Sequence, residues 1–337
     1  MSNETSRRDF LAQATVAGAG LALSGLSRAL PAASASASTG FGPLRQIDAG
    51  ALNVGYVDIG PRDGQPVMLF HGWPYDIHCY EEVAPLLAAK GLRVIVPHLR
   101  GYGTTRFLSD ATLRSGQQTA LAADAIALMD ALGIRKAVVA GCDWGARNAC
   151  VMAALWPERC QALVSVSGFL VLDRATALTP LAPADELTWW YQYYFATERG
   201  RIGYQTNLKA FAKLIWRQAS PQWRFDDATF ERCAQSLVNP DQVALVVHNY
   251  RWRIGAAEGD PQYDALERQL SQVKTVALPA ITLEGDANGA PHPPPAAYAS
   301  RFTGRYEHRN LTGGIGHNLP QEAPAEFARA VLDASRW

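Results

Sequence analysis

Short apolar runs alternate with amphipathic segments along most of the chain. Four of these runs have the length of buried strands, namely Pro66–Phe70, Gly91–Pro97, Lys136–Ala140 and Ala162–Val166. Helical spacing of apolar residues predicts helices between and after them, over residues 80–90, 115–132 and 146–156. Strands that alternate with helices in this way predict a mostly parallel sheet with helices on both faces.

The alternation is interrupted over residues 170–274. There the sequence is aromatic, and it predicts four helices, over residues 185–199, 202–218, 227–237 and 241–253. Strand patterning resumes at Thr275–Leu283. A helical block inserted between two strands of one sheet is expected to cover an active site. We therefore expect a core of residues 39–169 and 275–337, with residues 170–274 as a helical cap.

The first 38 residues differ in composition from the rest. A twin-arginine pair, Arg7–Arg8, is followed by an Ala/Gly/Leu run over residues 12–26 and by small residues at Ala33–Ala37. This order predicts a twin-arginine (Tat) export signal over residues 1–38. The apolar run is too short for a stable membrane anchor. We therefore expect the Tat translocon as a partner and a periplasmic or secreted location.

Charge and cysteine content narrow the classes of partner. Lys plus Arg and Asp plus Glu balance at 31 each in 337 residues, so composition gives no reason to expect nucleic acid or an anionic membrane as partner. The five cysteines are an odd number without repeated spacing, which predicts neither a disulfide framework nor a zinc site. We expect no metal ion and no organic cofactor.

The strongest chemical signal is Gly141–Gly145, which has the Gly-x-nucleophile-x-Gly pattern of a strand-to-helix elbow. Its central residue is Asp143 rather than serine. The start of the following helix favours the ionised carboxylate. Such a carboxylate attacks a saturated carbon and becomes an alkyl ester, which water must then cleave. Opening of epoxides and displacement of halide are therefore favoured over ordinary ester hydrolysis.

Three further motifs complete the chain order nucleophile, acid, histidine. His71–Pro74 ends one strand, an acidic patch at Glu284–Asn288 follows a late strand, and Gly313–His317 lies near the C-terminus. Together with the Asp143 elbow, these motifs resemble the α/β-hydrolase superfamily. Within it they resemble the branch of epoxide hydrolases and haloalkane or fluoroacetate dehalogenases. The resemblance covers the chain from about residue 41 and implies an α/β-hydrolase fold with an inserted helical cap.

The resemblance also implies roles for the core residues. Asp143 would be the nucleophile, and the backbone N–H groups of Trp73 and Trp144 would form the oxyanion hole. His317 would be the general base that activates water for attack on the carbonyl carbon of the Asp143 ester.

The acid that should orient His317 departs from the family pattern. The usual position, three residues after Gly285, holds Asn288, which can accept a hydrogen bond from a histidine but carries no charge. Asp286 is the nearest carboxylate, and the alternative acid position of some dehalogenases holds Ser167. We expect Asp286 to be the acid, with Asn288 as the alternative.

Two tyrosines of the predicted cap, Tyr191 and Tyr250, resemble the pair that binds the epoxide oxygen in epoxide hydrolases. Two phenols can hydrogen-bond that oxygen and supply a proton as the carbon–oxygen bond breaks. Trp190 and Gln192, beside Tyr191, are expected to contact the substrate. Fluoroacetate dehalogenases carry His-Trp where this chain has Gln192 and the next tyrosine, and Arg where it has Trp144. Both departures count against fluoroacetate.

These observations predict a hydrolase that opens small apolar epoxides to vicinal diols through a covalent Asp143 ester. The nearest alternative is a haloalkane or haloacid dehalogenase, because Trp144 is shared by haloalkane dehalogenases and epoxide hydrolases. An ester or lactone hydrolase with Asp143 as a base is a more distant alternative. A periplasmic binding protein without catalysis is another.

Overall fold

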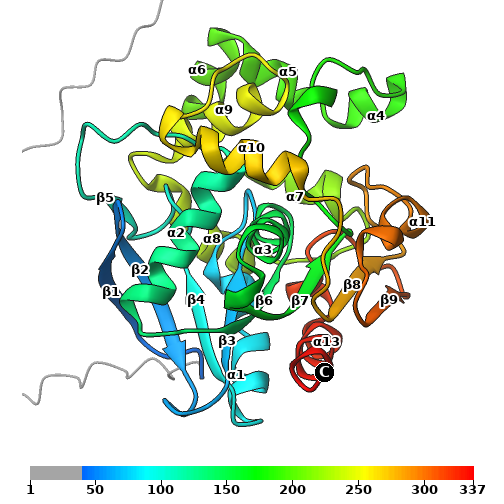
Figure 1. Cartoon of the computed structure of the whole chain (residues 1–337). Coiled ribbons are helices and arrows are strands. Elements are labelled where there is room, and N and C mark those ends of the chain that lie inside the picture. Colours follow the sequence, from blue (N-terminus) through cyan, green and yellow to red (C-terminus); the bar gives the residue numbers. More distant parts are fainter. Residues whose placement is uncertain (1–39) are drawn as a thin grey trace, which may run out of the picture. The chain divides into compact units, whose positions relative to one another are not determined.

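The computed structural model describes residues 40–337, and the predicted export signal lies outside them. Within the described residues, one sheet has the strand order β1-β2-β4-β3-β6-β7-β8-β9, with β5 paired to β2 (Figure 1). The strands are β1 (Leu44–Ala49), β2 (Leu52–Ile59), β3 (Pro66–Phe70), β4 (Arg93–Pro97), β5 (Arg106–Phe107), β6 (Ala137–Gly141), β7 (Cys160–Val166), β8 (Ala280–Gly285) and β9 (Tyr306–Leu311). All neighbours from β4 to β9 are parallel, whereas β1 and β2 join antiparallel. The mostly parallel sheet confirms the predicted fold class.

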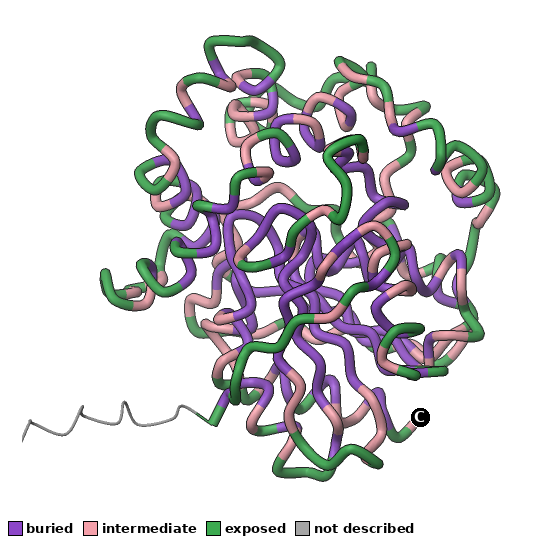
Figure 2. Tube along the Cα trace, turned by 90° about the vertical axis from the view of Figure 1, so that its left-hand side faces the viewer, coloured by how far each residue is buried: buried purple, intermediate pink, exposed green. Residues whose placement is uncertain are grey.

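Helices cover both faces of the sheet. α3 (Trp144–Leu155) and α13 (Pro324–Ser335) both pack on β6 and β7. α3 lies beside α2 (Gln118–Ala131) and α13 beside α1 (Val83–Ala88), so the two pairs occupy opposite faces. β6 is buried along its whole length, within the buried centre visible in Figure 2. Because both faces are covered, the central strands are continuous apolar runs, which is the pattern that locates them in the sequence.

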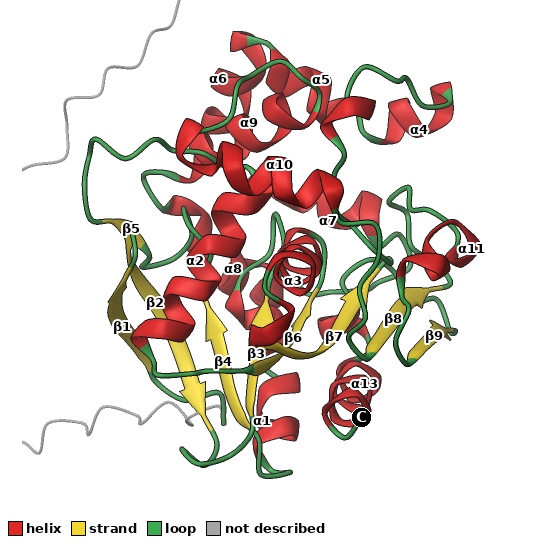
Figure 3. Cartoon of the chain, in the orientation of Figure 1, coloured by secondary structure: helices red, strands yellow, loops and turns green. Residues whose placement is uncertain are grey.

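The first six of the seven α-helices in the range of the predicted cap are α4 to α9, and α4, α5, α6 and α9 lie beyond the carboxyl ends of the parallel strands (Figure 3). These six helices are α4 (Pro183–Thr188), α5 (Trp190–Ala196), α6 (Glu198–Thr206), α7 (Leu208–Ala219), α8 (Asp227–Ala234) and α9 (Gln242–Arg253). The predicted helix over 185–199 is divided twice. Trp189 separates α4 from α5, and Thr197 separates α5 from α6, because Thr197 is extended and its hydroxyl caps α6 by accepting from the N–H of Gly200. The predicted helix over 202–218 is interrupted at Asn207.

Other elements differ from what the sequence pattern predicts. α10 (Asp264–Gln272) falls in the predicted cap range but packs against α3 of the core. β8 begins at Ala280 rather than at residue 275, because Pro279 has no N–H to donate and Val276 makes only an isolated bridge with Phe302. β9 has no fully buried residue and gives a weak apolar signal. The short helices α11 (Pro295–Tyr298) and α12 (Leu319–Glu322) complete the described chain.

Two features are absent from residues 40–337, namely a helix able to span a membrane and a disulfide bond. None of the helices there combines the length and apolar character needed to cross a bilayer. The five cysteines are all buried and unpaired, as expected of small apolar core residues.

Candidate active site

The elbow at Asp143 has the backbone geometry of a nucleophile turn. Asp143 lies between β6 and α3 with φ 56° and ψ −121°, a conformation that non-glycine residues rarely adopt. The flanking glycines are required by close packing: a Cβ on Gly141 would collide with the backbone of Gly145, and one on Gly145 would collide with the carbonyl of Phe70. The turn therefore presents the Asp143 carboxylate at the carboxyl edge of the sheet.

The loop after β3 places a backbone N–H, the first predicted oxyanion donor, at the Asp143 carboxylate. The backbone N–H of Trp73 donates to Oδ1 of Asp143 at 2.8 Å. Trp144 is the first residue of α3, where a helix N–H has no partner within the helix, so its N–H is available as the second donor. Gly72 has no side chain because a Cβ there would collide with the Asp143 carboxylate. His71 stabilises the loop, because its Nε2 accepts the backbone N–H of Leu99 at 3.1 Å.

His317 follows β9 and faces the other oxygen of the nucleophile. Its Nε2 lies 3.5 Å from Oδ2 of Asp143. Its backbone N–H donates to Oγ of Ser220 at 2.9 Å, and the Ser220 hydroxyl donates to Glu322 at 2.6 Å. Glu322 also accepts the N–H of Gly316 at 2.7 Å, so this carboxylate fixes the loop that carries the histidine.

The local charges favour an ionised nucleophile. Burial would raise the pKa of Asp143, but the hydrogen bond and charge of His317, the nearby Arg147 and the N–H of Trp73 together lower it. Burial would lower the pKa of His317, but Asp143, Glu284 and Glu322 together raise it. At neutral pH the site therefore holds the carboxylate that an attack on carbon requires.

The partner of His317 on its other ring nitrogen is Asn288. Oδ1 of Asn288 lies 3.2 Å from Nδ1 of His317, and the Asn288 side-chain amide donates to Oε1 of Glu284 at 2.7 Å. The same amide contacts Oγ of Ser167, the alternative acid position, at 3.3 Å. Asn288 thus occupies the place of the acid, with a carboxylate behind it that the sequence pattern does not single out.

The prediction that Asp286 is the acid is wrong. Its carboxylate is exposed and accepts the backbone N–H groups of Gly313, Gly314 and Ile315 at 2.9–3.0 Å. These hydrogen bonds lower its pKa and hold the glycine-rich turn before His317. Asp286 lies directly after β8, two positions before Asn288, and its side chain points in a different direction from that of Asn288. It therefore stabilises the loop and does not contact the imidazole.

The two cap tyrosines converge on the cavity above Asp143. Tyr191 on α5 and Tyr250 on α9 pack edge to face with ring centroids 5.2 Å apart, and both line the cavity with Asp143 and His317. Burial, with a smaller effect of the Asp143 charge, raises the pKa of Tyr191 to about 12. Burial also raises the pKa of Tyr250. Both phenols are therefore protonated donors at neutral pH.

Trp190 and Gln192, predicted to contact the substrate, do not line this cavity. The indole N–H of Trp190 donates to the side chain of Gln218 at 3.2 Å, and Gln192 is buried. On a helix, neighbours of Tyr191 point about 100° away from it, so only one of the three can face Asp143.

The cavity has a volume of about 230 Å³. Apolar side chains of Phe169, Leu170 and Ile215 form part of its wall. Two arginines that the sequence reasoning missed also line it. Arg147 lies one helical turn after Asp143, a spacing that could have revealed it, and Arg253 stacks 3.7 Å over the ring centre of Trp189.

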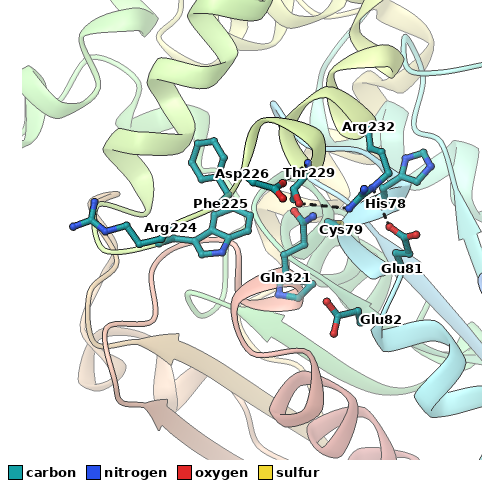
Figure 4. A pocket seen from close by; sticks show the side chains of 12 residues that line it. His78, Cys79, Glu81, Glu82, Arg224, Phe225, Asp226, Thr229, Arg232 and Gln321 are labelled. Atoms are coloured by element: carbon teal, nitrogen blue, oxygen red, sulfur yellow. Dashed lines mark hydrogen bonds and ion pairs between the residues drawn. The ribbon is translucent and has the colours of Figure 1, made fainter. Parts of the chain in front are cut away.

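A second hollow, of about 270 Å³, lies elsewhere on the surface (Figure 4). Its charged residues include Glu81 and Arg232, which pair with each other at 3.3 Å. Neither Asp143 nor His317 lines it. The cavity between the cap tyrosines and the elbow is therefore the candidate active site.

Comparison with known proteins agrees with this geometry. Residues 65–227 match the family described as alpha/beta hydrolase fold. A solved structure of a candidate epoxide hydrolase from Klebsiella pneumoniae subsp. pneumoniae is 59% identical, with a TM-score of 0.88 over 89% of this chain and 100% of that one. This chain belongs to the α/β-hydrolase superfamily. It is an enzyme of that superfamily, with the nucleophile elbow in its expected place.

Curated relatives of this α/β-hydrolase match over shorter stretches. Epoxide hydrolase B of Mycobacterium tuberculosis is 32% identical over 154 residues, 42% of this chain and 42% of that protein. A haloalkane dehalogenase of Mycobacterium marinum is 33% identical over 130 residues, 38% of this chain and 42% of that protein. The match therefore spans about two fifths of the length of these relatives.

Proposed function

We propose that this α/β-hydrolase opens small, largely apolar epoxides to vicinal diols through an alkyl ester on Asp143. The observation that carries the proposal is the position of Tyr191 and Tyr250, two protonated phenols that line one cavity with the nucleophile and the base. Two phenol donors that line one cavity fit an epoxide oxygen, which must gain a proton when its ring opens.

The first step uses the two Asp143 oxygens differently. Oδ1 accepts the N–H of Trp73, while Oδ2 is the oxygen next to His317 and is free to attack an epoxide carbon. The new bond forms between Oδ2 and carbon as the epoxide carbon–oxygen bond breaks. The released oxygen takes a proton from the tyrosine pair, which leaves a neutral hydroxyl on the ester.

The second step regenerates the carboxylate. His317 takes a proton from water, and the water oxygen attacks the carbonyl carbon of the ester. The negative charge develops on Oδ1, which the N–H groups of Trp73 and Trp144 stabilise. The bond between this carbon and Oδ2 then breaks, and the departing oxygen takes the proton held by His317, so the diol leaves with the former Asp143 oxygen. The carboxyl group keeps the oxygen of water, and the proton it loses replaces the one that the tyrosine pair gave up.

A single turnover in heavy-oxygen water tests this route. With enzyme in excess over styrene oxide, we expect unlabelled diol and one heavy oxygen in the peptide that contains Asp143, read by mass spectrometry. Heavy oxygen in the diol and none in the peptide would contradict the covalent route. His317→Gln should accumulate the ester, visible as an intact-mass increase equal to the epoxide, and Asp143→Asn should not.

Dehalogenation remains the nearest rival. A departing halide needs N–H donors, and the indole N–H of Trp144 already donates to the Tyr250 hydroxyl at 3.3 Å. We therefore expect diol formation from epoxides to exceed halide release from 1-bromobutane or 1,2-dibromoethane. Halide release without epoxide turnover would favour the rival.

A further inference from the structure

Glu284 is a buried carboxylate with no role in the steps above. It lies on β8 directly before Gly285 and is 7% exposed. Among the described residues, no lysine or arginine pairs with it, and the imidazole Nε2 of His292 lies 3.5 Å from Oε2. A buried carboxylate is costly unless hydrogen bonds compensate for lost water, so its position at the end of β8 calls for a reason.

Its hydrogen bonds lead directly to the catalytic histidine. Oε1 of Glu284 accepts the amide of Asn288 at 2.7 Å, and Oδ1 of Asn288 faces Nδ1 of His317 at 3.2 Å. The backbone N–H of Ala290 also donates to Oδ1 of Asn288, at 2.9 Å. A backbone N–H can only donate and a carboxylate can only accept, so the two groups fix the orientation of the Asn288 side chain.

This orientation decides the tautomer of His317. An asparagine with its amide nitrogen toward the ring would require Nδ1 to accept and would place the proton on Nε2. That tautomer cannot take a proton from water through Nε2. With Oδ1 toward the ring, Nδ1 carries the proton and Nε2, which faces Asp143, is free to act as the base.

We propose that Glu284 is the charged member of the catalytic assembly, a positioning residue that acts on His317 through the side chain of Asn288. When His317 takes a proton from water, the negative charge of Glu284 stabilises the resulting imidazolium. The effect passes through the Asn288 amide, which lies between the two groups and is polarised by the carboxylate. The proposal rests on the proposed function, in which His317 is the base that cleaves the Asp143 ester.

Other titratable groups surround the pair. On the side of His317 these are Asp143 and Glu322, which both act with Glu284 to raise the pKa of His317 against the effect of burial. On the side of Glu284 they are His292 and His308. Burial lowers the pKa of His308, and the negative charge of Glu284 opposes that lowering. Glu322 accepts two backbone N–H groups of the histidine loop, so replacing it would move the loop. Glu284 is the carboxylate whose charge can be changed separately.

Two substitutions separate charge from orientation. Glu284→Gln removes the charge but keeps an oxygen that can accept from Asn288, whereas Glu284→Met removes both. The double variant Asn288→Asp with Glu284→Gln returns a carboxylate, now in direct contact with His317. Glu307→Gln is the control, because Glu307 is an exposed carboxylate on the adjacent strand β9 and pairs with Arg309.

Rapid-quench single turnovers with styrene oxide give the first readout. In Glu284→Gln we expect ester hydrolysis to slow by about tenfold, less than the 10²–10⁴-fold that general-base catalysis typically provides, with ester formation unchanged. Glu284→Met should be slower still, and the double variant should recover most of the loss. Equal slowing of both steps, or no recovery in the double variant, would overturn the proposal.

Nuclear magnetic resonance of the imidazole nitrogens gives a readout that needs no substrate. We expect the pKa of His317 to fall in Glu284→Gln and to stay at the wild-type value in Glu307→Gln, with both variants melting close to wild type. An unchanged His317 titration in Glu284→Gln would overturn the proposal. Failure of wild type to form an ester would instead contradict the proposed function, and the titration would still report on Glu284.

Discussion

Trp73 and Asp143 are joined by a backbone N–H that donates to Oδ1 of the carboxylate at 2.8 Å. In the proposed mechanism this contact assigns Oδ1 as the oxygen that carries the negative charge during ester hydrolysis and leaves Oδ2 as the nucleophile. The contact depends on the absence of a side chain at Gly72, where a Cβ would collide with the carboxylate.

We therefore expect Gly72→Ala to reduce kcat/KM by about 10²-fold, because a displacement of the nucleophile by about 1 Å has that cost. Steady-state kinetics with an epoxide substrate would measure it. Gly40→Ala is the control, since a Cβ there makes only ordinary contacts with Pro85 at 3.8 Å. Similar losses in both variants would contradict a specific effect on Asp143.

Removal of the two phenols should affect the alkylation step. Tyr191→Phe and Tyr250→Phe should each slow ester formation, and the double variant should lose about 10²–10⁴-fold, the range typical of general acid catalysis. Tyr193→Phe is the control on the same helix, because its side chain is exposed. Single-turnover rates of ester formation give the measurement, and an active double variant would exclude the phenols as proton donors.

Each of the two steps should be sensitive to pH on one side only: ester hydrolysis at low pH and ester formation at high pH. His317 must be neutral to accept a proton, and in the free enzyme Asp143, Glu284 and Glu322 raise its pKa against the effect of burial. In the ester Asp143 carries no charge, so the pKa of His317 should lie below its free-enzyme value, and ester hydrolysis should fall as the pH drops through that lower value. The phenols must stay protonated, and the pKa of Tyr191 is about 12, so ester formation should not fall between pH 8 and about pH 10. Stopped-flow rates of the two steps across pH would test both limits.

Export remains a proposal, since the predicted signal lies outside the described residues. We expect replacement of Arg7 and Arg8 by lysines to keep the enzyme in the cytoplasmic fraction, because the twin-arginine pair is read as an address rather than as charge. Cell fractionation followed by immunoblotting measures the distribution. An unchanged distribution in the variant would contradict a twin-arginine signal.

Part of the site could be predicted from short-range pattern. The elbow needs glycines at 141 and 145 within a few residues of Asp143, and its strand and helix are strongly periodic, so the proposed nucleophile can be located in the sequence. The resemblance to epoxide hydrolases points to the two cap tyrosines, and they line the cavity with Asp143. The neighbours of Tyr191 were assigned wrongly, because adjacent residues of a helix face different surroundings.

The chain's own sequence determined the order of strands and helices, the Asp143 elbow and the general position of the histidine, since local pattern and chain order express these properties. Only the tertiary structure decided which polar residue of Glu284–Asn288 meets His317. Asp286 points to the backbone of Gly313–Ile315, whereas Asn288 reaches the imidazole with Glu284 behind it. The physical reason is that side-chain direction at the end of a strand depends on the turn that follows and on contacts with distant segments, which spacing along the chain does not encode.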